Sequence, residues 1–319
     1  MSVHRTSVAL VAAAGALLAL GPVIPNWAVS LVNVSLGIGV VVLGMMVLMR
    51  TGLVSFGHGL YYCLGAYAAG LASNRFGAPD MLAMVAGGAL AALLVSAVLG
   101  LLLAKYREIF FAMLSLAFSM ILYGLLVKSA DLGSTDGFNV HAKSIAGFAV
   151  EGDAHRLGVY SVIVITAALC ALLLDAYLRS HRGRLAEAIR DNELRVEYMG
   201  ASVFATVHLN YVISAVLAGV GGALMAIHIG HIDPEMTYWP QSGEFVFIGI
   251  LSGTGSVFAP LLGSVVFETV RSYAYEKSPD TWQMVLGVTM LMVIVFLPGG
   301  LWSLASRLRG RPDSARTGG

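Results

Sequence analysis

The chain contains apolar stretches long enough to cross a lipid bilayer as helices, and these limit its fold more than any other feature. A helix needs about 17 to 25 mostly apolar residues to span the hydrocarbon core. Only 12% of the 319 residues are charged, against roughly 25% in soluble domains. Clear stretches of this length lie at 7–24, 29–49, 81–104, 108–128, 157–178, 207–228 and 281–297. The sequence therefore predicts an all-α polytopic membrane protein, with residues 1–319 forming a single integral membrane domain.

Two further apolar segments are interrupted by glycine and polar residues. Residues 52–73 begin with GLVSFGHG, and residues 243–275 contain GILSGTGSVFAPLLG. Unwound backbone at membrane depth is tolerated only where protein or water satisfies its polar groups, so a pair of broken segments points to a transport pathway. Counting the first as one span and the second as two short or re-entrant ones gives about ten transmembrane helices.

The residues at these two breaks are the candidates for lining a translocation pathway. His58 has a simpler alternative role as a hydrogen-bonded interior imidazole. The glycines have one as points of close helix packing. Glu244 is harder to explain in this way, because a carboxylate in the bilayer is costly unless it faces an aqueous cavity or a partner. The candidates are Ser55, Gly57, His58, Gly59, Ser242, Gly243 and Glu244.

Other charged residues in the apolar regions are expected to form structural ion pairs. Glu268 and Arg271 are three residues apart on a predicted helix, and Asp175 lies close to Arg179. No metal-ligand pattern and no nucleophile with a neighbouring base is evident. The chain also has no Gly-Lys dipeptide, which a Walker A phosphate loop requires. We therefore expect no enzymatic activity, no metal and no cofactor on this chain, with any ATP bound by other subunits.

A polar segment from Arg179 to Gly200 separates two apolar regions. Its apolar residues Leu185, Ile189, Val196 and Met199 recur at intervals of three, four or seven, so a continuous helix would place them in one stripe. A solvated or interfacial loop helix is one explanation of this pattern. The other is a helix on the membrane protein's surface that binds a partner.

The distribution of basic residues predicts the orientation in the membrane. Ten spans starting from a cytoplasmic N-terminus place most lysines and arginines on the cytoplasmic side, as the positive-inside rule requires. The first apolar run is taken as a retained span, because no cleavage site follows it. The C-terminal segment 303–319 then forms a basic cytoplasmic tail, and residues 129–156 form a polar outer loop. The basic residues predicted to share the cytoplasmic side include Arg50, Lys105, Arg107 and the five arginines from Arg179 to Arg195.

Several motifs resemble those of one family, the M-type permease subunit of bacterial branched-chain amino acid ABC importers. Together they cover most of the chain and are specific to that family. They are GLVSFGHGLYYCLGAYAAG at 52–70, LGSTDGF at 132–138, GRLAEAIRDNELRVEYMGASVFATVHLNYVISAVLAGVGGALMA at 183–226, WPQSGEFVFIGILSGTGSVFAPLLGSVV at 239–266 and LPGGLW at 297–302.

The resemblance implies a role for the polar segment. In these importers, residues 179–205 would be a cytoplasmic coupling segment similar to the EAA-type loop, although Ile189 stands where many such loops have a second alanine. It further implies an H-type permease partner, two cytoplasmic ATPase subunits, a periplasmic binding protein and a place in the bacterial inner membrane. The residues expected to contact an ATPase are Glu187, Ala188, Ile189, Arg190, Asp191, Asn192, Glu193 and Gly200.

The predicted function is therefore the permease subunit of an ATP-driven importer for branched-chain or similar hydrophobic amino acids. One alternative keeps this machinery but changes the solute to urea, a short amide or another small organic molecule. A second alternative, from a different class, is an ion-coupled secondary transporter that works alone, with Glu244 or His58 binding the coupling proton.

Overall fold

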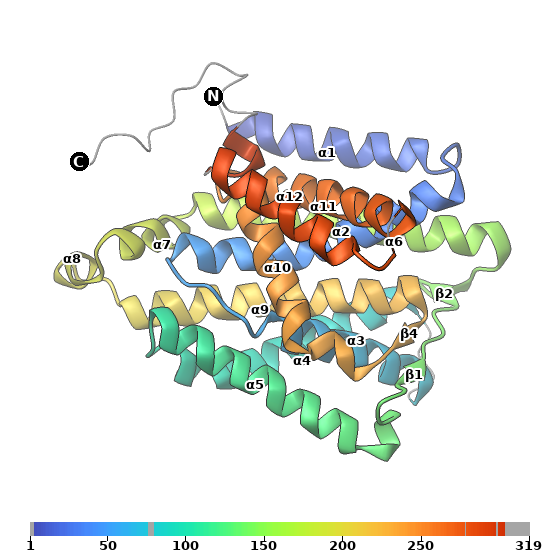
Figure 1. Ribbon diagram of the computed structural model, residues 1–319, viewed down its shortest axis with the longest axis horizontal. Coiled ribbons are helices and arrows are strands. Elements are labelled where there is room, and N and C mark those ends of the chain that lie inside the picture. The colour runs from blue at the N-terminus through green and yellow to red at the C-terminus, as the bar shows by residue number, and fades with distance from the viewer. Residues whose placement is uncertain (1–2, 76–79, 278, 298, 304–319) are drawn as a thin grey trace.

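The computed structural model describes residues 3–75, 80–277, 279–297 and 299–303. In these ranges the chain is an all-helical bundle (Figure 1), as the apolar pattern predicted. The helices of the bundle are α1 (Val3–Leu20), α2 (Asn26–Arg50), α3 (His58–Asn74), α4 (Met81–Leu103), α5 (Glu108–Lys128), α6 (Gly152–Arg179), α9 (Val203–Ile229), α10 (Trp239–Ser252), α11 (Phe258–Lys277) and α12 (Trp282–Phe296).

Five of these helices are long and apolar enough to cross a membrane: α2, α4, α5, α6 and α9. Shorter apolar stretches occur in α1 and α12. The predicted break in the 243–275 region is present, because α10 ends at Ser252 and α11 begins at Phe258. The chain is thus a multi-pass membrane protein that combines full-length and half-length helices.

Helix α9 lies at the centre of the bundle and packs against α2, α3 and α4. Glycines permit this close approach. A Cβ atom added at Gly88 of α4 would lie 2.8 Å from Ala223 Cβ and 3.0 Å from the Gly65 carbonyl oxygen. One added at Gly65 of α3 would overlap the Gly219 carbonyl of α9. This close approach of helices at glycines follows the small-residue rule for membrane helices.

The polar segment lies at one end of the bundle and contains two helices, α7 (His181–Asp191) and α8 (Glu193–Tyr198), where a single helix was predicted. Asn192 interrupts them with an extended backbone. Figure 1 shows α7 beside the ends of the bundle helices and α8 projecting beyond them. Ile189 and Val196 are buried, whereas Met199 is 78% exposed, so the predicted stripe of four residues was wrong at Met199.

The opposite end carries the short irregular elements. Residues 129–151 contain the 3-10 turn η1 (Ala130–Leu132) and the strands β1 (Phe138–Asn139), β2 (Ser144–Ile145) and β3 (Phe148–Ala149). Strand β1 pairs antiparallel with β4 (His231–Ile232), and β2 pairs with β3. Helix α6 already begins at Gly152, so the last residues of the predicted 129–156 loop are helical. The predicted basic tail lies outside the described residues, except for Ser303.

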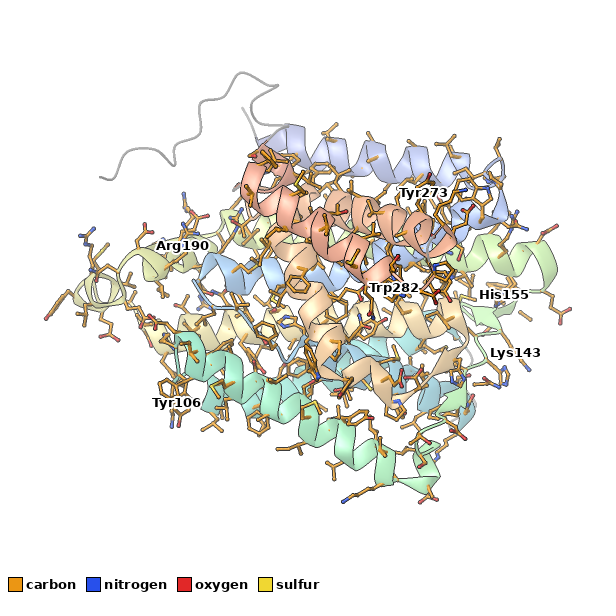
Figure 2. All side chains as sticks on the ribbon, viewed as in Figure 1. Tyr106, Lys143, His155, Arg190, Tyr273 and Trp282 are labelled. Atoms are coloured by element: carbon orange, nitrogen blue, oxygen red, sulfur yellow. The ribbon has the colours of Figure 1, made fainter. Side chains whose placement is uncertain are left out.

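Basic residues at the two ends follow the predicted separation. Arg50 and Arg107 both contact the α7–α8 segment, whereas Arg75 bonds the Asp131 carbonyl at the other end. Figure 2 shows the same separation, with Tyr106 and Arg190 at one end and Lys143 and His155 at the other. The structure therefore confirms which loops share an end, and the compartment that each end faces stays a prediction.

Candidate functional site

The start and end of α7 and α8 are set by local sequence. Ser180 caps α7, with its Oγ accepting a bond from the Gly183 amide at 3.2 Å. Asn192 caps α8 in the same way, with its Oδ1 2.9 Å from the Arg195 amide nitrogen. A short polar side chain before a helix satisfies amide groups that have no partner within the helix. Gly200 ends the segment with φ +82°, a backbone conformation that glycine adopts without strain.

Two ion pairs connect the α7–α8 segment to the bundle, and a third lies within α6, the helix that leads into the segment. Arg50 of α2 bonds Glu187 at 3.1 Å. Arg107, which precedes α5, bonds Glu193 at 2.5 Å. At the end of α6, Arg179 donates two bonds to Asp175, at 2.8 and 3.0 Å, which confirms the pair expected from the sequence.

The residues predicted to contact an ATPase therefore divide into two groups. Ile189 is 1% exposed and packs in the bundle core, while Glu187, Asn192 and Glu193 form the internal contacts just described. Glu187 and Asn192 are nevertheless exposed, as are Ala188, Arg190, Asp191 and Gly200, which form none of these contacts. Ile189 thus packs α7 against the bundle and is not accessible to another protein.

Helix α8 adds exposed apolar residues that sequence reasoning did not identify as contacts. Leu194 is 65% exposed, Tyr198 90% and Met199 78%. One continuous helix was assumed, so the break at Asn192 was missed and these residues were not identified. Leu194, Tyr198 and Met199 face outward, whereas Val196 of the same helix is buried.

The first candidate pathway segment is an unwound stretch inside the bundle. Helix α2 ends at Arg50 and α3 begins only at His58, yet Leu53 and Ser55 between them are buried. The Phe56 amide donates to Ser115 Oγ of α5 at 3.2 Å, and the Gly57 amide donates to Ser55 Oγ at 3.2 Å. The free backbone groups are thus satisfied by protein, as such a segment requires.

The second candidate segment meets the first. The 3-10 turn η2 (Pro234–Thr237) leads into the half-helix α10, and the Gly59 amide of α3 donates to Ser242 Oγ of α10 at 2.9 Å. A Cβ at Gly59 would lie 2.8 Å from that oxygen, so only glycine fits there without displacement. The structure therefore brings together the start of α3 and the start of α10, which lie far apart in the sequence.

Helix α5 holds both breaks through two buried serines. Ser115 bonds the backbone at Phe56, and Ser119 Oγ donates to the Thr237 carbonyl at 2.8 Å. Neither serine was among the predicted site residues. Their spacing of four places them on one helix face, which is the pattern that could have identified them.

His58 contacts neighbouring helices and not open space. Its Nε2 lies 2.6 Å from Ser214 Oγ of α9, and Ser214 Oγ donates to the Gly44 carbonyl of α2 at 2.6 Å. Because the Ser214 proton is used by Gly44, this arrangement requires His58 Nε2 to be the donor. His58 thereby joins the start of α3 to α2 and α9, which is the interior role considered as the alternative.

Glu244 belongs to an ion cluster that includes Glu268 and Arg271. Arg271 Nη1 lies 2.8 Å from Glu244 Oε1 and 3.3 Å from Glu268 Oε1. The guanidinium carbon also lies 5.6 Å from the centre of the Trp282 ring, within cation–π range. The predicted pair of Glu268 with Arg271 is confirmed. The link to Glu244, 27 residues away in sequence, was not predicted.

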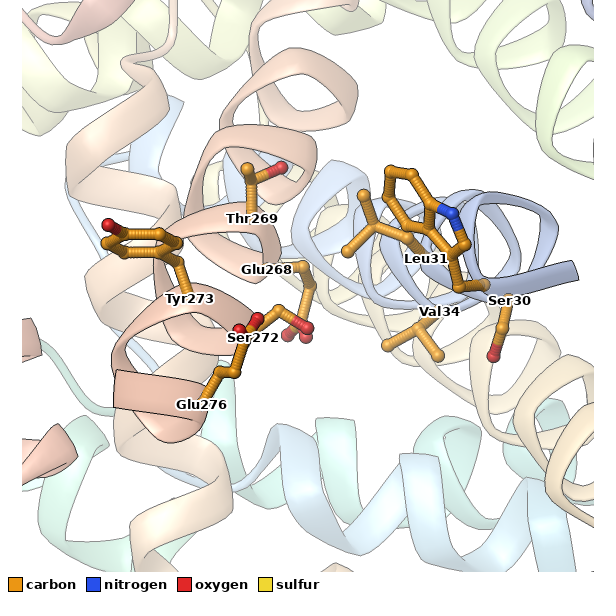
Figure 3. Close-up of a pocket in the computed structure, with 9 residues that line it drawn as sticks. Ser30, Leu31, Val34, Glu268, Thr269, Ser272, Tyr273 and Glu276 are labelled. Carbon is orange, nitrogen blue, oxygen red and sulfur yellow. The ribbon is translucent and has the colours of Figure 1, made fainter. Parts of the chain in front are cut away.

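Two cavities lie on either side of α11, and each includes one carboxylate of this cluster. The first, of about 350 Å³, separates α2 from α11. In Figure 3, Glu268, Ser272 and Glu276 of α11 face Ser30 and Val34 of α2 across it.

The second cavity, of about 420 Å³, lies between α10, α11 and α12 and includes Glu244. Gln283 and Gly287 of α12 also line it, and the rest of its wall is largely apolar. Its large apolar residues are Phe247, Phe267, Trp282, Leu286, Met290 and Leu291.

No group of three or more metal-ligating side chains was found among the residues that the structure describes. The arrangement instead consists of a segment projecting from one end, a protein-lined junction of half-helices inside the bundle and a charged cluster beside a cavity. Such features suit the movement of a solute across a membrane better than bond chemistry.

Comparisons with known proteins identify the family. A family model described as the branched-chain amino acid transport system permease component matches residues 27–294. The chain is 26% identical over 299 residues to the high-affinity branched-chain amino acid transport system permease protein LivM of Salmonella typhimurium, covering 85% of this chain and 68% of that protein. LivM of Escherichia coli is 25% identical, with the same coverage of both chains.

A second group of relatives is also similar. The permease protein LivH of Salmonella typhimurium is 24% identical over 279 residues, covering 82% of this chain and 87% of LivH. No solved structure matches the chain. Because the family model covers most of the sequence and the M-type relatives align along 85% of it, the chain belongs to the family of branched-chain amino acid transport permease components, as the motifs had predicted.

Proposed function

We propose that the chain is the M-type permease subunit of an ATP-driven importer for branched-chain or similar hydrophobic amino acids in a bacterial inner membrane. It would form half of the translocation pathway beside an H-type permease. Two cytoplasmic ATPases would supply the energy, and a periplasmic binding protein would deliver the solute. The N- and C-termini would lie in the cytoplasm.

The observation that supports this proposal best is the α7–α8 segment. It projects from the end of the bundle where Arg50 and Arg107 lie, and it presents Leu194, Tyr198 and Met199 to solvent. A short amphipathic helix of this kind suits a hydrophobic groove on another protein. An ion-coupled transporter that works alone has no use for such a surface.

The ion pairs supply the second requirement of coupling. A docked helix transmits movement only if it is fixed to the membrane helices, and Glu187 and Glu193 provide such attachments to α2 and to the start of α5. In the importer, closure of the ATPases around ATP would move α7 and α8 as a unit and shift the pathway between outward-open and inward-open states.

Purification of the tagged chain from its native membrane in mild detergent, with mass spectrometry of the associated proteins, tests the proposal. We expect a second permease and two ATPases to accompany it. The double variant Tyr198→Glu with Met199→Glu should lose the ATPases and retain the second permease. Phe148→Glu is the matched control, because Phe148 is 77% exposed at the opposite end of the bundle and should leave ATPase recovery unchanged.

Recovery of the chain alone would contradict the proposal, as would full ATPase recovery with the double variant. Uptake of labelled L-leucine into right-side-out vesicles, with ATP enclosed and the binding protein outside, then tests the solute. Uptake that needs only a proton gradient would support the secondary transporter instead.

A further inference from the structure

The ion cluster at Arg271 contains more negative than positive charge. Arg271 Nη1 contacts Glu244 at 2.8 Å and Glu268 at 3.3 Å, and the two carboxylate side chains are only 18% and 9% exposed. One guanidinium balances one of the two carboxylates. A second carboxylate away from water is costly in its charged form, and its charge is neutralised either by a proton or by another cation that joins the cluster. The cluster is therefore a place where an added positive group would be stabilised.

The cavity beside Glu244 has the shape and chemistry for a small amphipathic molecule. Its volume of about 420 Å³ falls in the range of roughly 300 to 1,000 Å³ typical of ligand sites. Among the described residues that line it, Glu244 is the one that is charged, and aromatic and aliphatic side chains such as Phe247, Trp282 and Met290 form most of the remaining wall. A ligand that fits must combine a cationic group with an apolar body.

Arg271 offers a third element of recognition. Both of its hydrogen bonds among the described residues use Nη1, which leaves the Nε and Nη2 groups as donors. Its side chain is 37% exposed, and it contacts Glu244 and Trp282, which both line the cavity. A carboxylate near the ammonium group of a ligand would find these donors within the same cluster.

We infer that the cavity between α10, α11 and α12 is a binding site for the amino acid substrate within the membrane. Glu244 binds the ammonium group, Arg271 binds the carboxylate, and the apolar wall holds the branched side chain. This inference rests on the proposed function and assigns its substrate a position in the chain. A free ammonium group is essential to the ligand, because it supplies the positive charge that the cluster lacks.

Equilibrium binding of tritiated L-leucine to the full-length chain in lipid nanodiscs tests the inference. Competitors separate the contributions of the two charged groups of leucine. 3-Methylbutylamine keeps the ammonium group and the branched chain, and 4-methylpentanoate keeps the carboxylate and the branched chain. We expect the amine to compete and the acid to compete weakly. Glu244→Gln should weaken leucine binding by at least about tenfold, since it removes a charge-assisted hydrogen bond.

Two further variants keep the test independent of folding. Gly287→Leu fills the same cavity from α12, where a Cβ atom would meet nothing within 4 Å, and it leaves the ion cluster untouched. It should abolish binding. Glu276→Gln removes a carboxylate that is 72% exposed and lines the cavity on the other side of α11, and it should bind leucine like the parent chain.

The results distinguish failure of this inference from failure of the proposed function. Parent-like leucine binding by Glu244→Gln and Gly287→Leu, in a chain whose vesicles import leucine, would overturn the site alone. Stronger competition by 4-methylpentanoate than by the amine would do the same. A chain that neither binds nor imports leucine would overturn both.

Discussion

Helix packing around α9 gives a prediction whose size follows from two neighbouring glycines of α4. A Cβ atom at Gly88 would lie 2.8 Å from Ala223 Cβ, whereas ordinary contacts are 3.4–4 Å, and one at Gly87 would meet nothing within 4 Å. Both replacements gain the same helix propensity of about 1 kcal/mol. Only Gly88→Ala forces α4 away from α9, at a cost of about 1–3 kcal/mol. The two variants should therefore differ in unfolding free energy by about 1–3 kcal/mol, with Gly87→Ala the more stable.

The chain carries its own probe for this measurement. Its two cysteines, Cys63 on α3 and Cys170 on α6, are both free and buried, so a thiol-reactive fluorophore reports the temperature at which the detergent-solubilised chain unfolds. We expect Gly87→Ala to unfold at or above the temperature of the parent chain and Gly88→Ala below that of Gly87→Ala. Equal unfolding temperatures for the two variants would refute close packing of α4 on α9.

Three further predictions concern the α7–α8 segment and the junction between α3 and α10. Charge reversal at Arg107 or at Glu193 alone should lower leucine uptake per ATP hydrolysed in proteoliposomes, and the swapped double variant should recover much of it. Because the pair is partly exposed, the interaction energy between the two side chains should be about 0.2–1 kcal/mol. A swapped variant no better than the single variants would exclude a direct interaction. Asn192→Ala should destabilise α8 by about 1 kcal/mol through loss of its cap and speed amide exchange in residues 193–198, while Asn192→Asp should preserve both. Ser242→Ala removes the acceptor of the Gly59 amide and should lower the unfolding temperature in the fluorophore assay, whereas Ser242→Thr should retain the hydrogen bond. An unchanged unfolding temperature for the alanine variant would show that water replaces the serine hydroxyl as acceptor.

Much of the fold could be predicted because hydropathy is a local property of the sequence. Apolar runs of sufficient length predicted the bundle, and glycine with polar residues in 52–73 and 243–275 indicated that helices are interrupted there. The bilayer requirement that backbone groups be paired then implied that these breaks lie inside protein. The bonds of the Phe56 and Gly57 amides to Ser115 and Ser55 agree with that reasoning at the first break.

Contacts between distant residues could not be predicted in the same way. The sequence near Glu244 does not indicate that Arg271 is its partner, because the pairing depends on how the connection between α10 and α11 packs one helix against the other. The end of the amphipathic stripe had a different cause. Apolar spacing continues through Asn192, but the extended backbone there breaks the helix, and the side chain of Asn192 caps the next one.

Helix α9 joins the α7–α8 segment to the junction of α3 and α10 through continuous structure. It begins three residues after Gly200, and its far end leads through β4 and η2 into α10. At about 1.5 Å per residue, its 27 residues span about 40 Å. Midway, Ser214 bonds both the Gly44 carbonyl of α2 and His58 at the start of α3. In the proposed importer, a movement of α8 would reach both half-helices by this one path, α3 through Ser214 and α10 through η2. The bond between Gly59 and Ser242 joins those two branches, so a displacement of α9 would reach this junction from both sides.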